Sequence, residues 1–221
     1  MDPFKTPLRY IGVMARLKTH DEALRLKLIN RAAATVFDRG TGALSLRKLA
    51  ADVKTSTTAV YSLFGNKAGL LDSLYEEAVR LFIARLGTVD SSDDPSADVV
   101  RLGIAYREYA LANPHLYGIV FADRGDYEPT PERRSEAGST IQPLVDAVVR
   151  GQAAGQFKEG TAEVIALSCW GAAHGLVSLE LSGNAPPGLD IGAAYEETLH
   201  AVVSGWCARA ADSAAQAPPT A

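Results

Sequence analysis

The stretch from Ser45 to Lys67, SLRKLAADVKTSTTAVYSLFGNK, decides the fold of the N-terminal part of this chain. It holds two short runs of apolar residues at helical spacing, and each run follows a serine, Ser45 or Ser56, that is suited to cap a helix. Lys54 and Thr55 lie between the two runs as a tight turn. Two short helices joined in this way predict a helix-turn-helix.

A longer helix is expected before this stretch and another after it. Thr19 and Glu22 have the spacing of a capping box, which predicts a helix start near Thr19, and Gly40 predicts the end of that helix. Asn66 is suited to cap the following helix. We therefore expect a three-helix domain over residues 20–66. The apolar stripe of its first helix consists of Leu28, Ile29, Ala32, Ala33, Val36 and Phe37.

The rest of the chain is also predicted to be helical, because no alternating strand pattern of useful length occurs in it. Asp94 before Pro95 is a typical helix entry, and Asn113 before a proline is a typical helix end. The fold class is therefore all-α, with a second helical domain over residues 67–212. Helices are expected at about residues 95–112, 141–155, 161–182 and 190–210, with a short apolar segment at 116–121 and a loop at 123–138.

The two ends of the chain are expected to lie outside these domains. Residues 1–19 carry four basic residues and one acidic residue. We interpret them as a flexible basic arm; the alternative is an arm that lies in the minor groove of DNA. Residues 213–221 hold no core-forming side chain and are predicted to be a disordered tail.

Charge is distributed unevenly along the chain. Residues 1–69 hold 12 Lys and Arg against five Asp and Glu, a net charge of +7, although the whole chain has a net charge of −4. The remaining residues are therefore at −11. A basic N-terminal part on an acidic body indicates that the basic part contacts a polyanion.

Composition excludes several classes of protein. With 47% hydrophobic and 22% charged residues, the chain is typical of a soluble globular protein. The most apolar stretch, residues 164–177, is too short and too rich in Ala and Gly for a membrane span. Two cysteines form neither a disulfide framework nor a zinc site, and no secretory signal is apparent. We expect a cytoplasmic protein without a metal or cofactor.

The N-terminal part closely resembles the TetR family of bacterial transcription regulators. The resemblance covers about residues 24–82 and rests on Leu49-Ala50, Ala59-Val60-Tyr61, Phe64, Asn66-Lys67 and Leu70-Leu71, all at the spacing of the family. It implies a repressor, usually a dimer, that leaves a palindromic DNA operator when a small molecule occupies the larger domain.

The turn departs from the family pattern. The family usually has Gly and then an aliphatic residue where this chain has Lys54 and Thr55. Glycine is favoured there because the turn can require a positive φ, which is strained for a residue with a Cβ. Either Lys54 tolerates that strain and adds a contact to a DNA phosphate, or the geometry of the turn is shifted.

The resemblance also assigns contacts to the DNA backbone. By position, Ser45, Tyr61 and Lys67 match family residues that hold phosphates, which suits hydroxyls and a lysine at a helix start. The alternatives are that Ser45 only caps its helix, that Tyr61 is half-buried packing and that Lys67 is an ordinary surface lysine.

Arg47, Thr57 and Thr58 are the candidates for contacts to base edges. Arginine can bond to O6 and N7 of guanine, and threonine can contact the methyl group of thymine. Lys48 and Lys54 are phosphate contacts or solvated charges. The full set of DNA-binding candidates is Ser45, Arg47, Lys48, Lys54, Ser56, Thr57, Thr58, Tyr61 and Lys67.

The body resembles the C-terminal domain of one TetR subgroup, through Trp170, His174 and Gly175 and through the segment 113–117. Trp170 and His174 are four residues apart and share a helical face. His174 is either part of a cavity for a small hydrophobic ligand or a core histidine beside a core tryptophan. The ligand-binding candidates are Tyr106, Tyr109, Tyr117, Phe121, Trp170 and His174.

The last two helices, about 161–182 and 190–210, are rich in small and branched apolar residues. In the family, the matching helices of two subunits form a four-helix bundle, so we expect a homodimer. Two recognition helices held about 34–36 Å apart can read a palindrome.

Two other functions compete with a regulator. One is a helical adaptor that has lost DNA binding, which only the unusual turn supports. The other is a small enzyme centred on His174 with Cys169 or Glu180. It is disfavoured because Cys169 and His174, five residues apart, point in different directions on a helix. The sequence also holds no nucleophile elbow, phosphate loop or metal spacing.

Overall fold

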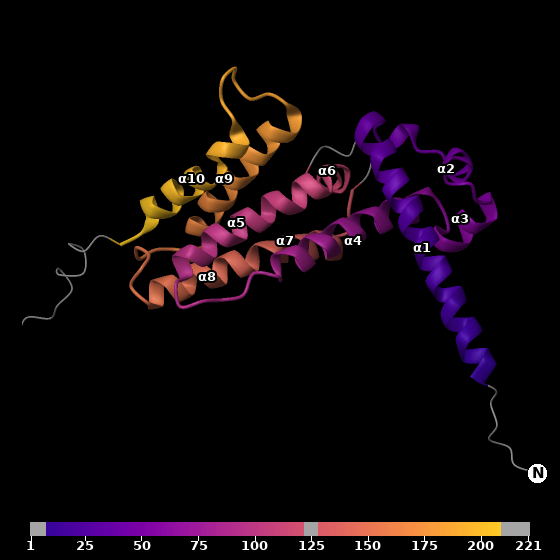
Figure 1. Cartoon of the computed structure of the whole chain (residues 1–221), viewed down its shortest axis with the longest axis horizontal. Coiled ribbons are helices and arrows are strands. Elements are labelled where there is room, and N and C mark those ends of the chain that lie inside the picture. The colour runs from indigo at the N-terminus through magenta and orange to yellow at the C-terminus, as the bar shows by residue number, and fades with distance from the viewer. Residues whose placement is uncertain (1–7, 122–127, 209–221) are drawn as a thin grey trace, which may run out of the picture. The chain divides into compact units, whose positions relative to one another are not determined.

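The computed structural model describes residues 8–121 and 128–208, with side chains from residue 21 onward (Figure 1). The described residues are helical apart from turns, 3₁₀ turns and one isolated β-bridge, which confirms the all-α fold class. The predicted tail, 213–221, and residues 1–7 of the predicted arm lie outside the described residues. The helices are α1 (Leu8–Arg39), α2 (Leu46–Val53), α3 (Thr57–Phe64), α4 (Lys67–Leu86), α5 (Pro95–Ala112), α6 (Pro114–Phe121), α7 (Pro131–Gly138), α8 (Gln142–Ala153), α9 (Ala162–Ser182) and α10 (Ile191–Trp206).

The chain divides into two compact units, of which the first comprises residues 1–78 and 118–129. In this unit α1 packs against α2, and α2 packs against α3. Leu28 and Ile29 of α1 and Val60 of α3 are completely buried, as their helical spacing predicts. Phe37 is an exception to the predicted stripe, because nearly half of its surface is exposed.

Side-chain caps fix the ends of the short helices. The Ser45 hydroxyl accepts a hydrogen bond from the Lys48 amide (3.4 Å), and the Ser56 hydroxyl accepts one from the Ala59 amide (3.1 Å). Asn66 caps α4 through the Gly69 amide, at 2.9 Å. Each cap satisfies an amide that lacks a partner within its helix. The predicted starts of α2, α3 and α4 are therefore confirmed.

Two segments are more helical than the sequence predicted. Helix α1 begins at Leu8, so Thr19 lies inside it and does not cap its start. Residues 8–18 hold no proline and a single glycine, so nothing in them breaks a helix. In the predicted loop 123–138, residues from Pro131 onward form α7, which Thr130 caps through the Arg133 amide.

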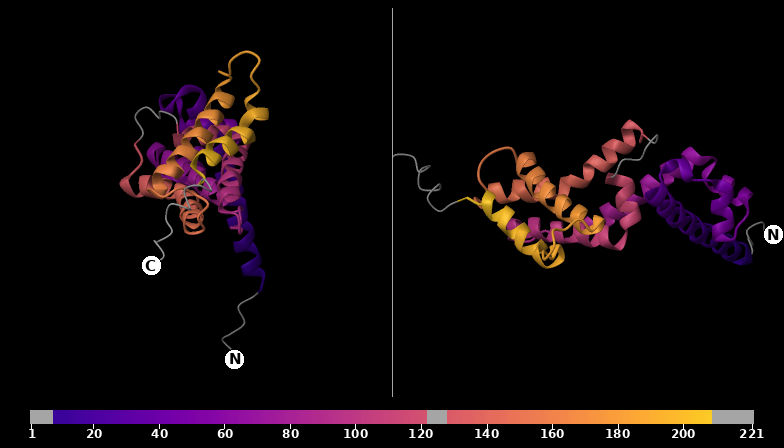
Figure 2. Two further views of the ribbon diagram at one scale, coloured as in Figure 1. Left: turned by 90° about the vertical axis from the view of Figure 1, so that its left-hand side faces the viewer. Right: turned by 90° about the horizontal axis from the view of Figure 1, so that it is seen from above.

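The second unit comprises residues 79–117 and 130–221. Helix α5 packs against α8, α9 and α10, and α9 and α10 lie side by side (Figure 2). Tyr109 and Val148 are among its fully buried side chains. The Tyr195 hydroxyl donates to the Gly103 carbonyl at 2.8 Å, which joins α10 to α5.

Helix α10 is shorter than predicted and ends at Trp206 instead of residue 210. Beyond that point the chain pairs with the segment before α9. Cys207 forms a β-bridge with Phe157, the Lys158 amide donates to the Trp206 carbonyl (3.0 Å), and the Ala208 amide donates to the Gln156 carbonyl (2.8 Å). These long-range bonds replace the helical ones that residues 207–208 would make.

Among the described residues, α9 is the one helix whose length and composition would fit a membrane span. Such a signal is weak, because core helices of soluble proteins share it. One side of α9 packs within the second unit, where Ile165, Cys169 and Val177 are buried.

Candidate nucleic-acid interface and ligand site

The turn of the helix-turn-helix has a left-handed residue at Lys54, with φ 59° and ψ 46°. Among the described non-glycine residues, Lys54 alone has a positive φ. Its amide bonds to the carbonyls of Ala50 and Ala51, which closes the end of α2. The turn thus keeps the conformation that favours glycine, and the alternative of a shifted geometry is wrong. The adaptor hypothesis loses its only support with it.

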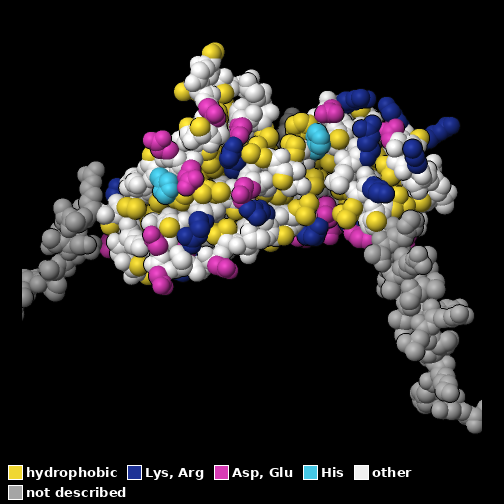
Figure 3. Space-filling view, viewed as in Figure 1, with side chains coloured by type: hydrophobic (Ala, Val, Ile, Leu, Met, Phe, Trp, Pro, Cys, Tyr) yellow, Lys and Arg dark blue, Asp and Glu magenta, His cyan; other side chains and the backbone are white. Residues whose placement is uncertain are grey.

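The candidate DNA contacts lie on the accessible side of α2 and α3. Arg47, Lys48 and Lys54 are exposed, and Thr57 is half-buried. Lys and Arg side chains gather on the face of the first unit that is visible in Figure 3. Exposed positive charge is therefore present on α2 and in the turn, as a contact with phosphates requires.

Helix α3 separates its core residues from its accessible residues. Val60 and Phe64 are buried, whereas Thr58 and Tyr61, three residues apart, are exposed. Tyr61 keeps 52% of its surface in solvent, which fits half-buried packing and also leaves part of the side chain open to a partner.

The candidate contacts at the helix starts differ in how accessible they are. Ser45 and Ser56 are exposed while their hydroxyls also cap α2 and α3. Capping does not exclude a phosphate contact, because a hydroxyl can accept one bond and donate another. Lys67 is half-buried at the start of α4.

An ion pair that the sequence analysis missed fixes α2 on α1. Nε and one terminal nitrogen of Arg31 donate to the same carboxylate oxygen of Asp52, at 2.9 and 2.7 Å. No local signal reveals this pair, because 21 residues separate its members. It orients α2 and hence the exposed Arg47 and Lys48.

The second unit brings together three of the ligand-binding candidates. The hydroxyls of Tyr106 and Tyr117 lie 3.0 Å apart, and each lies 2.8 Å from Nδ1 of His174. They come from α5, α6 and α9. The Trp170 and His174 ring centroids are 5.7 Å apart, so the tryptophan borders the same cluster.

The other two candidates lie apart from this cluster. Tyr109 is buried and stacks on Phe82, with ring centroids 4.9 Å apart, so it packs in the core of the second unit. Phe121 is half-buried and belongs to the first unit.

Burial makes the cluster electrically neutral. It raises the pKa of Tyr106 far above its usual value and also raises the pKa of Tyr117. Burial lowers the pKa of His174, which favours the neutral imidazole, and Nδ1 lies within hydrogen-bond distance of both phenols. In the tautomer whose Nδ1 accepts from a phenol, Nε2 carries the proton toward the Ser178 hydroxyl, which lies at 3.5 Å.

The residues of the enzyme hypothesis are not activated. Burial raises the pKa of the Cys169 thiol to about 11, which disfavours the nucleophilic thiolate. Arg107 holds the Glu180 carboxylate with two bonds of 2.6 and 2.7 Å. The described residues also include no group of three or more side chains that could ligate a metal ion.

Two family profiles match the chain. The profile described as bacterial regulatory proteins, tetR family, matches residues 28–74, and the one described as tetracyclin repressor-like, C-terminal domain, matches residues 99–202. Together they account for more than half of the chain. The chain belongs to the TetR family.

Known proteins of similar sequence and fold agree with this assignment. The HTH-type transcriptional regulator Rv1816 of Mycobacterium tuberculosis is 25% identical over 145 residues, which are 62% of this chain and 61% of that regulator. A solved structure of a protein of unknown function from a Rhodococcus species is 26% identical, with a TM-score of 0.71, and the match covers 84% of this chain and 96% of that one.

Proteins of lower sequence identity to this chain also share its fold. The TetR family transcriptional regulator PfmR of Thermus thermophilus is 19% identical, with a TM-score of 0.66, and the match covers 82% of this chain and 99% of that one. The TetR family, Rv1816 and PfmR are regulators, not enzymes.

Proposed function

We propose that this TetR-family chain is a homodimeric DNA-binding repressor, which a small hydrophobic molecule releases from a palindromic operator. The observation that carries the proposal is the left-handed turn at Lys54. It joins α2 to α3 in the manner of a helix-turn-helix and leaves Thr58 and Tyr61 of α3 exposed. A recognition helix must present its first residues in this way to enter the major groove.

The accessible side chains divide into two roles. Ser45, Tyr61 and Lys67 bind phosphates and set the position of α3, with Lys48, Lys54 and Ser56 in support. Arg47, Thr57 and Thr58 read base edges. The ion pair between Arg31 and Asp52 holds α2 at the orientation that these contacts need.

The exposed side of α9 supports a dimer. Only 28% of the most apolar 18-residue stretch of α9 is buried. Val164 and Leu167 of this helix keep 54% and 53% of their surface in solvent. Gly171, four residues beyond Leu167, is also exposed and continues the same stripe. A second copy of this chain, meeting α9 and α10 with its own pair, covers this stripe and places two copies of α3 on the two half-sites of a palindrome.

The cluster of Tyr106, Tyr117 and His174 is the proposed ligand site, with Trp170 at its border. The polar groups of the cluster are neutral and surrounded by buried apolar residues, which favours a small, uncharged, largely hydrophobic molecule. Phe121 and Tyr109 lie apart from the cluster, so we assign them no direct contact with the ligand. We also assign the chain to the TetR subgroup that Trp170 and His174 mark.

In vitro selection tests the DNA-binding part. The full chain is incubated with duplexes of random sequence at fixed salt, and bound duplexes are amplified and sequenced through several rounds. We expect a palindrome to be enriched, with half-sites about one helical turn apart. Thr58→Ala should change the bases selected in each half-site, while Thr88→Ala, outside the first unit, should select the same palindrome as the parent. Enrichment of no sequence by the folded parent would contradict the proposal.

A further inference from the structure

A cleft of about 550 Å³ lies in the second unit, between the end of α4, the linker that follows it and one face of α5. Its volume is within the range of small-molecule sites. The cleft is lined by Arg85, Val89, Arg101, Ile104 and Glu108, and also by Thr88, Ser91 and Ser92.

This cleft is distinct from the cluster around His174. Arg101, Ile104 and Glu108 are three, four and seven residues apart, so they share one face of α5. Tyr106 and Tyr109 are on another face of the same helix and are buried. A ligand in the cleft therefore contacts none of the aromatic side chains of that cluster.

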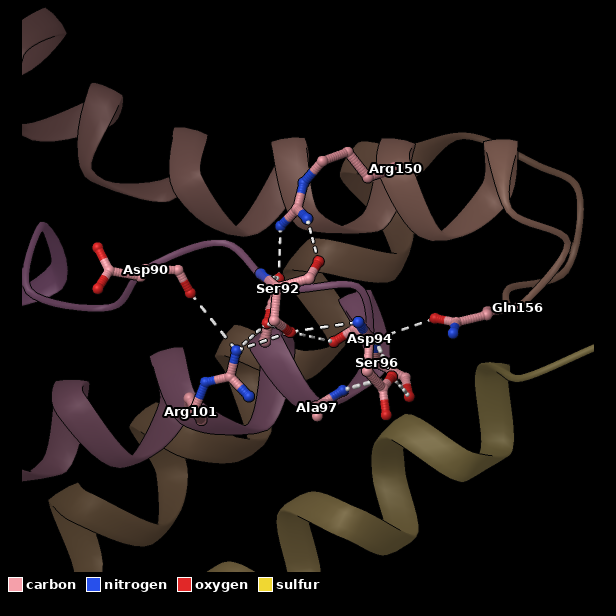
Figure 4. Close-up of polar contacts among 9 residues, drawn as sticks. Asp90, Ser92, Asp94, Ser96, Ala97, Arg101, Arg150 and Gln156 are labelled. Carbon is pink, nitrogen blue, oxygen red and sulfur yellow. Dashed lines mark hydrogen bonds and ion pairs between the residues drawn. The ribbon is translucent and has the colours of Figure 1, made fainter.

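A buried carboxylate holds Arg101 in place, and Figure 4 shows the further contacts of Arg101 with Asp90 and Ser92 of the linker. Asp98 is only 2% exposed and pairs with both Arg101 and Arg150. Ser92 donates to Asp98 through its amide (3.0 Å) and its hydroxyl (2.6 Å). All of the Arg101 bonds to described residues use one terminal nitrogen, Nη2, so Nε and Nη1 remain available to another acceptor.

Arg85 adds a donor without an acceptor. Its terminal nitrogen Nη2 donates to the Glu108 carboxylate, but its Nε is buried and has no hydrogen-bond partner among the described residues. A buried N–H group that lacks an acceptor is destabilising, and such groups are rare in native proteins. Arg85 also lines the cleft, so a turn of its side chain that brings Nε to an acceptor in the cleft removes this defect.

We propose that the cleft is a second ligand site, for a small organic monocarboxylate. Its carboxylate bonds to Arg85 and Arg101, and its apolar part lies on Val89 and Ile104. Arginine is suited to this because its planar donors match the two oxygens of a carboxylate. A single negative charge fits better than two, because Glu108 and Asp90 also line the cleft and repel a dianion.

The test is a calorimetric titration of the full chain with benzoate at constant ionic strength, with benzamide as the neutral control. We expect benzoate to saturate one site per chain and benzamide to bind at least about tenfold more weakly, since it forms no charge-assisted bond. Arg85→Gln should weaken benzoate binding about tenfold. Glu108→Gln should strengthen it, because it removes a competitor for Arg85. Arg133→Gln, an arginine on α7, is the matched control and should leave binding unchanged.

Each outcome decides the proposal once thermal melting shows that a variant is folded. Weaker binding in Arg85→Gln together with tighter binding in Glu108→Gln supports it. Equal affinity for benzoate and benzamide, or an Arg85→Gln variant that binds as the parent does, would overturn it. So would the absence of saturable benzoate binding up to about 10 mM. If Arg85→Gln does not fold, Glu108→Gln carries the test, and unchanged binding in that variant overturns the proposal.

Discussion

The phenol oxygen of Tyr106 lies 2.8 Å from Nδ1 of His174, although 68 residues separate the two in sequence. This hydrogen bond joins α5 to α9 inside the second unit. Tyr117 makes the same contact from α6, at 2.8 Å. Nδ1 can accept from a phenol or donate to it, but burial of the cluster lowers the pKa of His174 and so favours the neutral imidazole there.

The neutral state of His174 predicts a pH dependence of stability. Burial lowers the pKa of His174 in the folded chain below the value of about 6.5 in the unfolded chain. Between these two values the unfolded chain binds more protons, so the free energy of unfolding rises with pH. This contribution is complete above about pH 6.5, and it declines as the pH falls toward the folded pKa, by no more than about 1.4 kcal/mol per pH unit.

Urea unfolding at several pH values between about 5 and 8 measures this effect. His174→Gln should remove part of the slope of unfolding free energy against pH, and the exposed His200→Gln should retain it. If both variants keep the parent slope, the folded state does not disfavour protonation of His174.

Lys54 is predicted to lower the stability of the chain through backbone strain and to raise its affinity for DNA through its charge. Its left-handed conformation is strained for a residue with a Cβ. Lys54→Gly should therefore raise the free energy of unfolding by about 0.5–1 kcal/mol. The loss of one charge should weaken DNA binding and reduce the slope of log affinity against log salt by about one unit.

Lys54→Ala separates the two effects, because alanine keeps the Cβ and loses the charge. It should bind DNA as Lys54→Gly does but gain no stability. Fluorescence anisotropy of a labelled duplex over a range of salt concentrations measures the slope, and urea unfolding measures the stability. An unchanged salt slope in both variants would remove Lys54 from the DNA interface.

The exposed stripe of α9 predicts how to break the dimer. Leu167→Glu places a charge where a second copy is expected to pack, at a side chain that is 53% exposed in the single chain. Sedimentation should show a monomer, and affinity for the selected palindrome should fall at least about tenfold because the half-sites are no longer linked. Leu111→Glu, on α5 and also exposed, is the matched control. A dimeric Leu167→Glu variant would place the interface elsewhere.

Gly151 is predicted to tolerate no side chain. A Cβ at this position would lie 2.3 and 2.6 Å from ring atoms of Phe157 and 3.3 Å from Cβ of Pro95. Gly151→Ala should therefore lower the free energy of unfolding by about 1–3 kcal/mol through overpacking. At Gly205 of α10 nothing lies within 4 Å of such a Cβ, and Gly205→Ala should be neutral or slightly stabilising. Thermal or urea unfolding compares the two, and equal effects would contradict the packing argument.

The sequence by itself determined the features that depend on neighbours within about four residues. Ser45, Ser56 and Asn66 cap their helices as their positions predict, and Asp94 does the same for α5. For the turn, the sequence left a positive φ at Lys54 and a shifted geometry as alternatives, and the structure shows the positive φ. Capping, periodicity and turn chemistry are local, so a single sequence contains them.

Only the tertiary structure decided which distant side chains meet. The sequence did not separate the three tyrosine candidates from one another, yet packing gathers Tyr106 and Tyr117 around His174 and buries Tyr109 in the core. The same holds for the partner of Arg31, the end of α10 at Trp206 and the unpaired Nε of Arg85. Each depends on contacts between residues far apart in the chain, and those contacts follow from how the helices pack, which the periodicity of one helix does not specify.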